Sequence, residues 1–167
     1  MTEIIHRNYL EINSIEDLIE SNSPEIECSV NLVDPFDFQV NKFFYKNVGK
    51  KYRWIDRLNW SDAQWMNYVS NQNLETYILK VKNEFSGYFE LLFHKDTNEI
   101  EIAYLGLLEE YHNKKLGSFL LSYAIKMSFK KNIKRAWVHT CTLDHKNALK
   151  NYIARGMKIF KEETISI

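Results

Sequence analysis

Residues 112–118, HNKKLGS, have the composition of a loop that binds an anion. They lead into an apolar pattern that predicts a helix over 116–130, so the loop's backbone amides would form the helix N-terminus. Such amides, with the positive end of the helix dipole, bind phosphate groups. Gly117 lets the backbone approach a ligand closely, and the ammonium groups of Lys114 and Lys115 add charge pairing. The expected contacts come from His112, Asn113, Lys114, Lys115, Leu116, Gly117 and Ser118.

A thiol and two imidazoles lie close together in the sequence at Cys141, His139 and His145. Alternation along a strand would place His139 and Cys141 on one face, as in a nucleophile with its base. A nucleophilic thiolate also needs a lowered pKa, so Cys141 as a small buried thiol is the favoured interpretation. Cys28 is distant, and no cluster has metal-ligand spacing, so no metal site is predicted.

Aromatic and charged side chains alternate at Trp54, Asp56, Arg57 and Trp60. Asp56 could attract a cationic amine, and the tryptophans could form a wall or contact the cation. The alternative is an ordinary aromatic core with surface charges. The residue types alone leave both interpretations open.

The elements that must position these residues follow from periodicity and turn signals. Strands are expected over 4–12, 26–33, 75–81, 85–93, 100–107, 136–140 and 157–165, and helices over 14–21, 36–48, 61–70, 116–130 and 146–155. Breaks at 83–84 and 96–98 are typical of hairpins, so the middle strands should be antiparallel. Gly156 is expected to cap the last helix. This order predicts an α+β fold, without the fingerprints of a dinucleotide-binding fold or a P-loop.

Length, composition and net charge predict one globular domain and exclude some classes of function. The chain has 167 residues, which suits one domain over 1–167, and it is 45% hydrophobic and 26% charged, as in globular proteins. Twenty-two basic residues balance 22 acidic ones, so bulk attraction to nucleic acid is not expected. No secretion signal or membrane-length apolar run is evident, and the two cysteines suit reduced thiols, so a cytoplasmic location is expected.

Residues 99–160 resemble the conserved half of the GCN5-related N-acetyltransferase (GNAT) superfamily. The family motif is a strand, a loop Q/R-x-x-G-x-G/A and a long helix, here EIEIAYLGLLEEYHNKKLGSFLLSYAIKMSF. His112 replaces the usual Gln or Arg, and Lys115 replaces the first glycine. A second element, HKNALKNYIARGM over 145–157, matches the family's tyrosine helix and the glycine that follows it. Residues 43–62 also resemble a stretch found in some family members.

The resemblance implies a mixed α/β sandwich with helices on both faces. Its central, twisted sheet would be mostly antiparallel, with one splayed parallel strand pair. Acetyl-CoA would be the co-substrate, its diphosphate on the loop at 112–118 and its pantetheine arm in the gap between the splayed strands. The arm would bond to the backbone of Leu105, Gly106 and Leu107, and the Leu105 amide would lie near the thioester oxygen. His145 is expected beside the cofactor, with Asp144 either at the site or as a helix N-cap.

Two residues are expected to carry the chemistry by resemblance. Glu101 lies where several family members have a glutamate that takes the proton of the amine, although it could simply be a solvent-facing strand residue. Its rivals for this role are Glu90 and Glu99. Tyr152 would protonate the departing thiolate, or else would pack in the core. The amine would attack the thioester directly.

The implied function is acetyl transfer to a primary amine of a small molecule or peptide. Trp54, Asp56, Trp60, His139 and Cys141 are the candidates for the acceptor site. Two alternatives remain: a non-catalytic module that binds acyl-CoA, and an acetyltransferase that acts on protein or tRNA. A homodimer is compatible with the resemblance.

Overall fold

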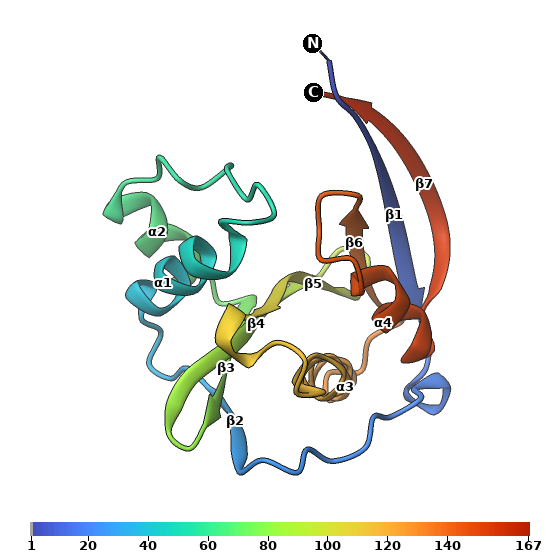
Figure 1. Ribbon diagram of the computed structural model, residues 1–167, viewed down its shortest axis with the longest axis horizontal. Helices are drawn as coiled ribbons and strands as arrows, with labels where there is room; N and C mark the ends of the chain where they lie inside the picture. Colours follow the sequence, from blue (N-terminus) through green and yellow to red (C-terminus); the bar gives the residue numbers. More distant parts are fainter. Residues whose placement is uncertain (1) are drawn as a thin grey trace.

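The computed structural model describes residues 2–167 and contains a seven-stranded sheet flanked by helices (Figure 1). The strands are β1 (Ile4–Ile12), β2 (Cys28–Leu32), β3 (Leu74–Val81), β4 (Glu84–His94), β5 (Glu99–Leu107), β6 (Arg135–Cys141) and β7 (Lys158–Ser166). The α-helices are α1 (Phe38–Gly49), α2 (Asp62–Val69), α3 (Leu116–Phe129) and α4 (Ala148–Ala154). Short 3₁₀ turns cover Ile15–Asp17 and Glu109–Tyr111.

The sheet has the strand order β2-β3-β4-β5-β6-β1-β7, and every neighbouring pair except β5–β6 is antiparallel. Helices α1 and α2 lie over one face, and α3 and α4 lie over the other (Figure 1). The expected α+β architecture with helices on both faces is therefore confirmed. The N-terminal strand β1, to which sequence reasoning gave no role, inserts between β6 and β7.

Strands β5 and β6 pair over three residues and then part. Their register ends at Glu101 opposite Trp137, although β5 continues to Leu107 and β6 to Cys141. Just beyond Glu101, Ala103 has no partner on β4, because Ile102 pairs with Leu91 and Tyr104 with Glu90. A residue inserted in this way bends and twists its strand. We attribute the parting of the two strands in part to this bulge.

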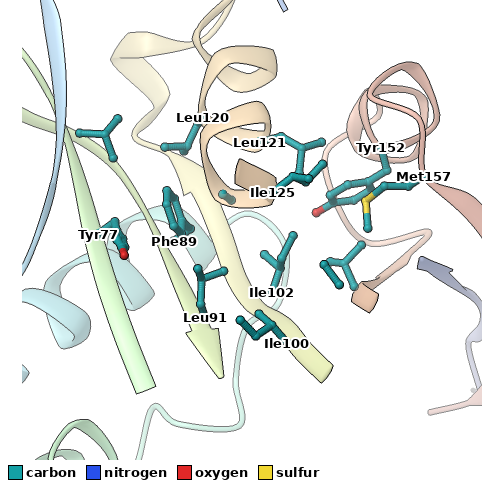
Figure 2. Close-up of a cluster of buried hydrophobic side chains, with 14 of the residues drawn as sticks. Tyr77, Phe89, Leu91, Ile100, Ile102, Leu120, Leu121, Ile125, Tyr152 and Met157 are labelled. Carbon is teal, nitrogen blue, oxygen red and sulfur yellow. The ribbon is translucent and has the colours of Figure 1, made fainter. Parts of the chain in front are cut away.

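The main core fills the space between α3 and the sheet (Figure 2). Leu120, Leu121 and Ile125 of α3 are fully buried, as expected for this apolar helix. Tyr152 and Met157 reach toward α3 from the side of α4 (Figure 2). Burying one large apolar side chain stabilises a fold by about 1.5–3 kcal/mol. The core therefore holds the N-terminus of α3 and the tyrosine of α4 in a fixed relation to β5.

All five predicted helices are at least one residue shorter in the structure. The one at 14–21 is a single 3₁₀ turn, because the Ile19 amide donates to the carbonyl of Arg155 and not to its own helix. The helix at 36–48 begins at Phe38, where the side chain of Asp37 accepts from the Gln39 amide. Helix α4 begins at Ala148, after the expected start at 146.

The end of α4 is as predicted. Gly156 has φ 101°, a left-handed conformation that favours glycine, and a Cβ there would lie 2.2 Å from the Asp17 carbonyl oxygen.

Candidate active site at the parting strands

A cleft of about 860 Å³ passes through the gap between β5 and β6. Its walls include α4 on one face of the sheet and the 52–57 loop on the other. The predicted site residues that line it are Trp54, Asp56, Glu101, Leu105, Gly106, Leu107, His112, Asn113, Lys115, Leu116, Gly117, Ser118, His139, Cys141, His145 and Tyr152. Lys114 and Trp60 do not line it. One cavity thus brings together residues from 54 to 152.

The loop before α3 lines this cleft through Asn113 and residues 115–118. No described residue accepts a hydrogen bond from the amides of residues 113–118. Asn113 and Lys115 have φ of 62° and 61°, so Lys115 takes the left-handed conformation that the family's glycine would adopt. This costs about 1–2 kcal/mol for a residue with a Cβ. The lysine at 115 thus occupies a backbone conformation that glycine adopts without this cost.

Two histidines, His112 and His145, line the cleft next to each other. The Nε2 atom of His112 lies 3.2 Å from the Leu107 carbonyl oxygen, so this side chain ties the loop to the end of β5. His145 packs edge-on against His112, with ring centroids 5.2 Å apart, and its Nδ1 accepts from the Asn147 amide at 3.0 Å. Burial and the neighbouring His112 lower the pKa of His145. At neutral pH the His145 ring is therefore mostly neutral.

Tyr152 places a protonated hydroxyl at the cleft. The residue is 8% exposed, and none of the described residues hydrogen-bonds to its hydroxyl. Burial, and secondarily Asp144, raises the pKa of Tyr152 well above its ordinary value. The hydroxyl therefore keeps its proton at physiological pH and is free to donate to a ligand in the cleft.

Among the three acidic candidates, only Glu101 lines the cleft. Glu99 is bound to Arg135. Glu90 is fully buried and belongs to a separate network. The Oε1 atom of Glu101 lies 3.0 Å from His94 Nε2. The structure therefore favours Glu101 over its rivals as the carboxylate available to a substrate.

Sequence reasoning missed a buried ion pair beneath the 52–60 loop. Glu90 accepts from Asn41 at 2.8 Å, from Tyr68 at 2.6 Å and from Arg57 at 3.3 Å. Arg57 is 8% exposed, and its guanidinium lies 4.0–5.6 Å from five aromatic ring centroids. Burial opposes the charge, yet Glu90 keeps the net pKa of Arg57 raised. A lone glutamate in the apolar run YFELLF was the available signal that a partner must exist.

The aromatic loop at 54–60 divides into residues that pack around Arg57 and residues that line the cleft. Trp60 packs on Trp65, Tyr68 and the guanidinium of Arg57, so it belongs to the aromatic cluster around Arg57 and not to the cleft wall. Trp54 packs on Tyr104 and also lines the cleft. Asp56 is exposed and lines the cleft as well. The loop is thus anchored by Arg57 and presents its neighbours to the cavity.

The residues at the end of β6 and just after it have simpler roles than a nucleophile would require. Burial raises the pKa of the Cys141 thiol, which agrees with its interpretation as an inert thiol. Asp144 does not cap α4; it accepts from the Thr140 hydroxyl and from the Cys141 amide, at 3.1 Å for the latter. Asn147 is the N-terminal residue flanking α4. The ring of His139 is open to the cleft, where burial, and secondarily Arg7, lowers its pKa.

Two further findings concern residues 2–167 as a whole. No three His, Cys, Asp or Glu side chains among them cluster as metal ligands. None of the helices in this part of the chain has the length and apolar character needed to cross a membrane.

The fold and cleft define a class: α+β proteins in which a ligand site opens between two parted parallel strands. Within that class, the profile of the acetyltransferase (GNAT) family matches residues 38–157. The chain therefore belongs to the GNAT acetyltransferase family. No curated protein matches it in sequence.

Solved structures share the fold at low sequence identity. A GCN5-related N-acetyltransferase from Kribbella flavida has a TM-score of 0.69 at 15% identity, over 99% of this chain and 58% of that one. Another, from Sphaerobacter thermophilus, has a TM-score of 0.76 at 9% identity, over 98% of this chain and 51% of that one. An aminoglycoside acetyltransferase from an uncultured soil metagenomic sample, in complex with trehalose, has a TM-score of 0.63 at 11% identity, over 77% and 86%. The chain thus spans little more than half of the first two proteins.

Proposed function

We propose that the protein transfers an acetyl group from acetyl-CoA to a primary amine of a small molecule or peptide. One observation carries the proposal: Asn113 and residues 115–118, whose backbone amides have no acceptor among the described residues, line the same cleft as Glu101 and Tyr152. An anion-binding helix N-terminus at one end and acid–base groups further along suit a phosphate-bearing acyl carrier.

The cofactor site is formed mostly by backbone. The diphosphate lies on the amides of 113–118, and the dipole of α3 adds a favourable field. The ammonium group of Lys115 adds positive charge to the loop. Asn151 stabilises the loop by donating a hydrogen bond from Nδ2 to the Gly117 carbonyl oxygen at 3.2 Å. The pantetheine arm takes the β5 edge that β6 leaves unpaired beyond Glu101, along Leu105, Gly106 and Leu107. A chain of amide groups fits there because an unpaired strand edge offers matching donors and acceptors.

The chemistry is direct attack by the amine. Glu101 takes a proton from the ammonium, because an alkyl ammonium has no free electron pair. The Leu105 amide steadies the negative charge that develops on the thioester oxygen. Tyr152 then donates a hydrogen bond to the leaving sulfur as the carbon–sulfur bond breaks. Since burial raises the pKa of Tyr152, the hydroxyl keeps its proton, and the thiolate is protonated by the second proton that the attacking nitrogen loses when the amide forms.

The acceptor enters from the face that carries the 52–57 loop. Asp56 offers an exposed carboxylate there, and Trp54 and Tyr104 offer aromatic surface. His139 and Cys141 line the opposite wall from β6. These groups suit a cationic acceptor, and one protein of similar fold is an aminoglycoside acetyltransferase. We place the enzyme in the cytoplasm, where acetyl-CoA is available.

The activity test is incubation with acetyl-CoA and a panel of amines, with detection of free CoA. We expect CoA release that depends on the amine and acetylated product of matching mass. Binding of acetyl-CoA without turnover on any small amine, peptide, protein or tRNA would favour the non-catalytic alternative.

Alanine substitutions at Gly117 and Gly106 distinguish a glycine needed to bind the ligand from a glycine needed for the fold. A Cβ at Gly117 would meet nothing closer than 3.9 Å, so Gly117→Ala should leave stability unchanged or raise it by up to about 1 kcal/mol. The same methyl would crowd the diphosphate and weaken acetyl-CoA binding by about tenfold, or about 1.4 kcal/mol. Calorimetric titration and thermal unfolding measure the two effects.

Gly106→Ala is the matched control, with the opposite expectation. Its Cβ would lie 2.3 Å from Cγ1 of Val48, a stiff side chain on α1, so we expect a loss of about 1–3 kcal/mol of stability. If Gly117→Ala binds acetyl-CoA as tightly as the wild type, the diphosphate does not lie on this loop.

A further inference from the structure

Glu101 lines the cleft and also contacts His94, a residue outside the cleft. It occupies the last paired position between β5 and β6, opposite Trp137, so its side chain lies where the gap begins. The side chain is 19% exposed and lines the cleft. On its rear side, Oε1 lies 3.0 Å from Nε2 of His94, which does not line the cleft.

His94 is itself held in place by the fold. It ends β4, and its ring packs over Trp137 with centroids 6.0 Å apart and planes at 28°. Its side chain is 35% exposed, so the ring reaches solvent on the side away from Glu101. The nearby charged groups are engaged elsewhere: Arg135 binds both Glu99 and Glu11. Among the described residues, His94 is the one side chain that hydrogen-bonds to Glu101.

We propose that His94 is a positioning residue for Glu101, and this inference rests on the proposed function. The Nε2–H group of His94 donates to Oε1 and fixes the carboxylate plane. Oε2 is then left with its electron pairs toward the cleft. The proton taken from the ammonium goes to Oε2 and leaves to water when the carboxylate is regenerated, so no proton has to pass to His94.

This arrangement solves a geometric problem for a glutamate base on a strand. A glutamate side chain has three rotatable bonds, and a freely rotating carboxylate would face the amine only part of the time. A single fixed hydrogen bond removes most of that freedom before the acceptor binds. The imidazole suits this role because Trp137 and the strand backbone already limit its own rotation.

Two substitutions test the role. His94→Ala removes the donor, and we expect kcat to fall by about tenfold, the equivalent of one lost hydrogen bond. The KM for acetyl-CoA should stay within about twofold, because His94 lies outside the cleft. His94→Gln places an amide donor near the position of Nε2 and should recover most of the lost kcat. Thermal unfolding of both variants checks that a half-exposed residue has not changed the fold.

The outcomes separate this inference from the function on which it rests. An active wild type with an equally fast His94→Ala variant would overturn the positioning role alone. The same conclusion follows if His94→Gln is as slow as His94→Ala, since the donor would then not be the relevant feature. A wild type that releases no CoA with any amine would overturn the proposed function, and this inference with it.

Discussion

Arg57→Ala is expected to lower the free energy of unfolding by about 3–5 kcal/mol, because it leaves the carboxylate of Glu90 charged and buried without its cation. Glu90 is fully buried, and Asn41 and Tyr68 can donate to it but cannot neutralise it. The five rings around the guanidinium would also face a cavity. Urea unfolding followed by tryptophan fluorescence measures the loss.

Two further variants test whether the loss of stability comes from the unpaired, buried charge of Glu90. Lys42→Ala removes a solvent-exposed ion pair with Asp62 and should cost less than about 1 kcal/mol. The double variant Arg57→Ala/Glu90→Ala should cost much less than the sum of the single changes, because the second substitution removes the unpaired charge. Additive losses would mean that the two side chains stabilise the fold independently.

Tyr152→Phe is expected to lower turnover by roughly 10²–10⁴-fold, the range for loss of a positioned acid–base group. The hydroxyl has no partner among the described residues, so its removal breaks no internal hydrogen bond. The phenyl ring retains the packing against α3 (Figure 2). We therefore expect stability and acetyl-CoA affinity to change little while kcat falls. Steady-state kinetics with the best amine of the panel measures the effect.

A matched tyrosine controls for loss of a hydroxyl as such. Tyr123 also packs against the main core but does not line the cleft, so Tyr123→Phe should keep wild-type kinetics. Equal kcat in Tyr152→Phe and the wild type would remove Tyr152 from the chemistry and leave the leaving thiolate to be stabilised by backbone or water.

Much of the fold could be predicted from local sequence patterns. The strand alternation, the apolar face of α3 and the glycine after α4 each reflect forces within a few residues, and the structure contains the corresponding elements. The family was also recognisable, because the loop at 112–118 and the tyrosine helix follow each other in the expected order. Lys115 replaces the first glycine of the motif and has a left-handed backbone conformation, which favours glycine.

The features that local sequence patterns do not predict depend on contacts between distant segments. The place of β1 between β6 and β7 follows from pairing across more than 120 residues. Arg57 and Glu90 meet across 33 residues, and neither pattern nor motif pairs them. The contact between His94 and Glu101 depends on the register of the β4–β5 hairpin. Local sequence does not specify such a register, because several pairings would satisfy the same alternation.

In the proposed function, peptide groups at the start of α3 hold the phosphates of acetyl-CoA. Hydrogen exchange of individual backbone amides, with and without saturating CoA, measures this most directly. We expect amides within 113–118, which have no acceptor in the described chain, to become strongly protected, while amides of α2 keep their exchange rates. Saturating CoA that leaves the exchange of 113–118 unchanged would contradict it.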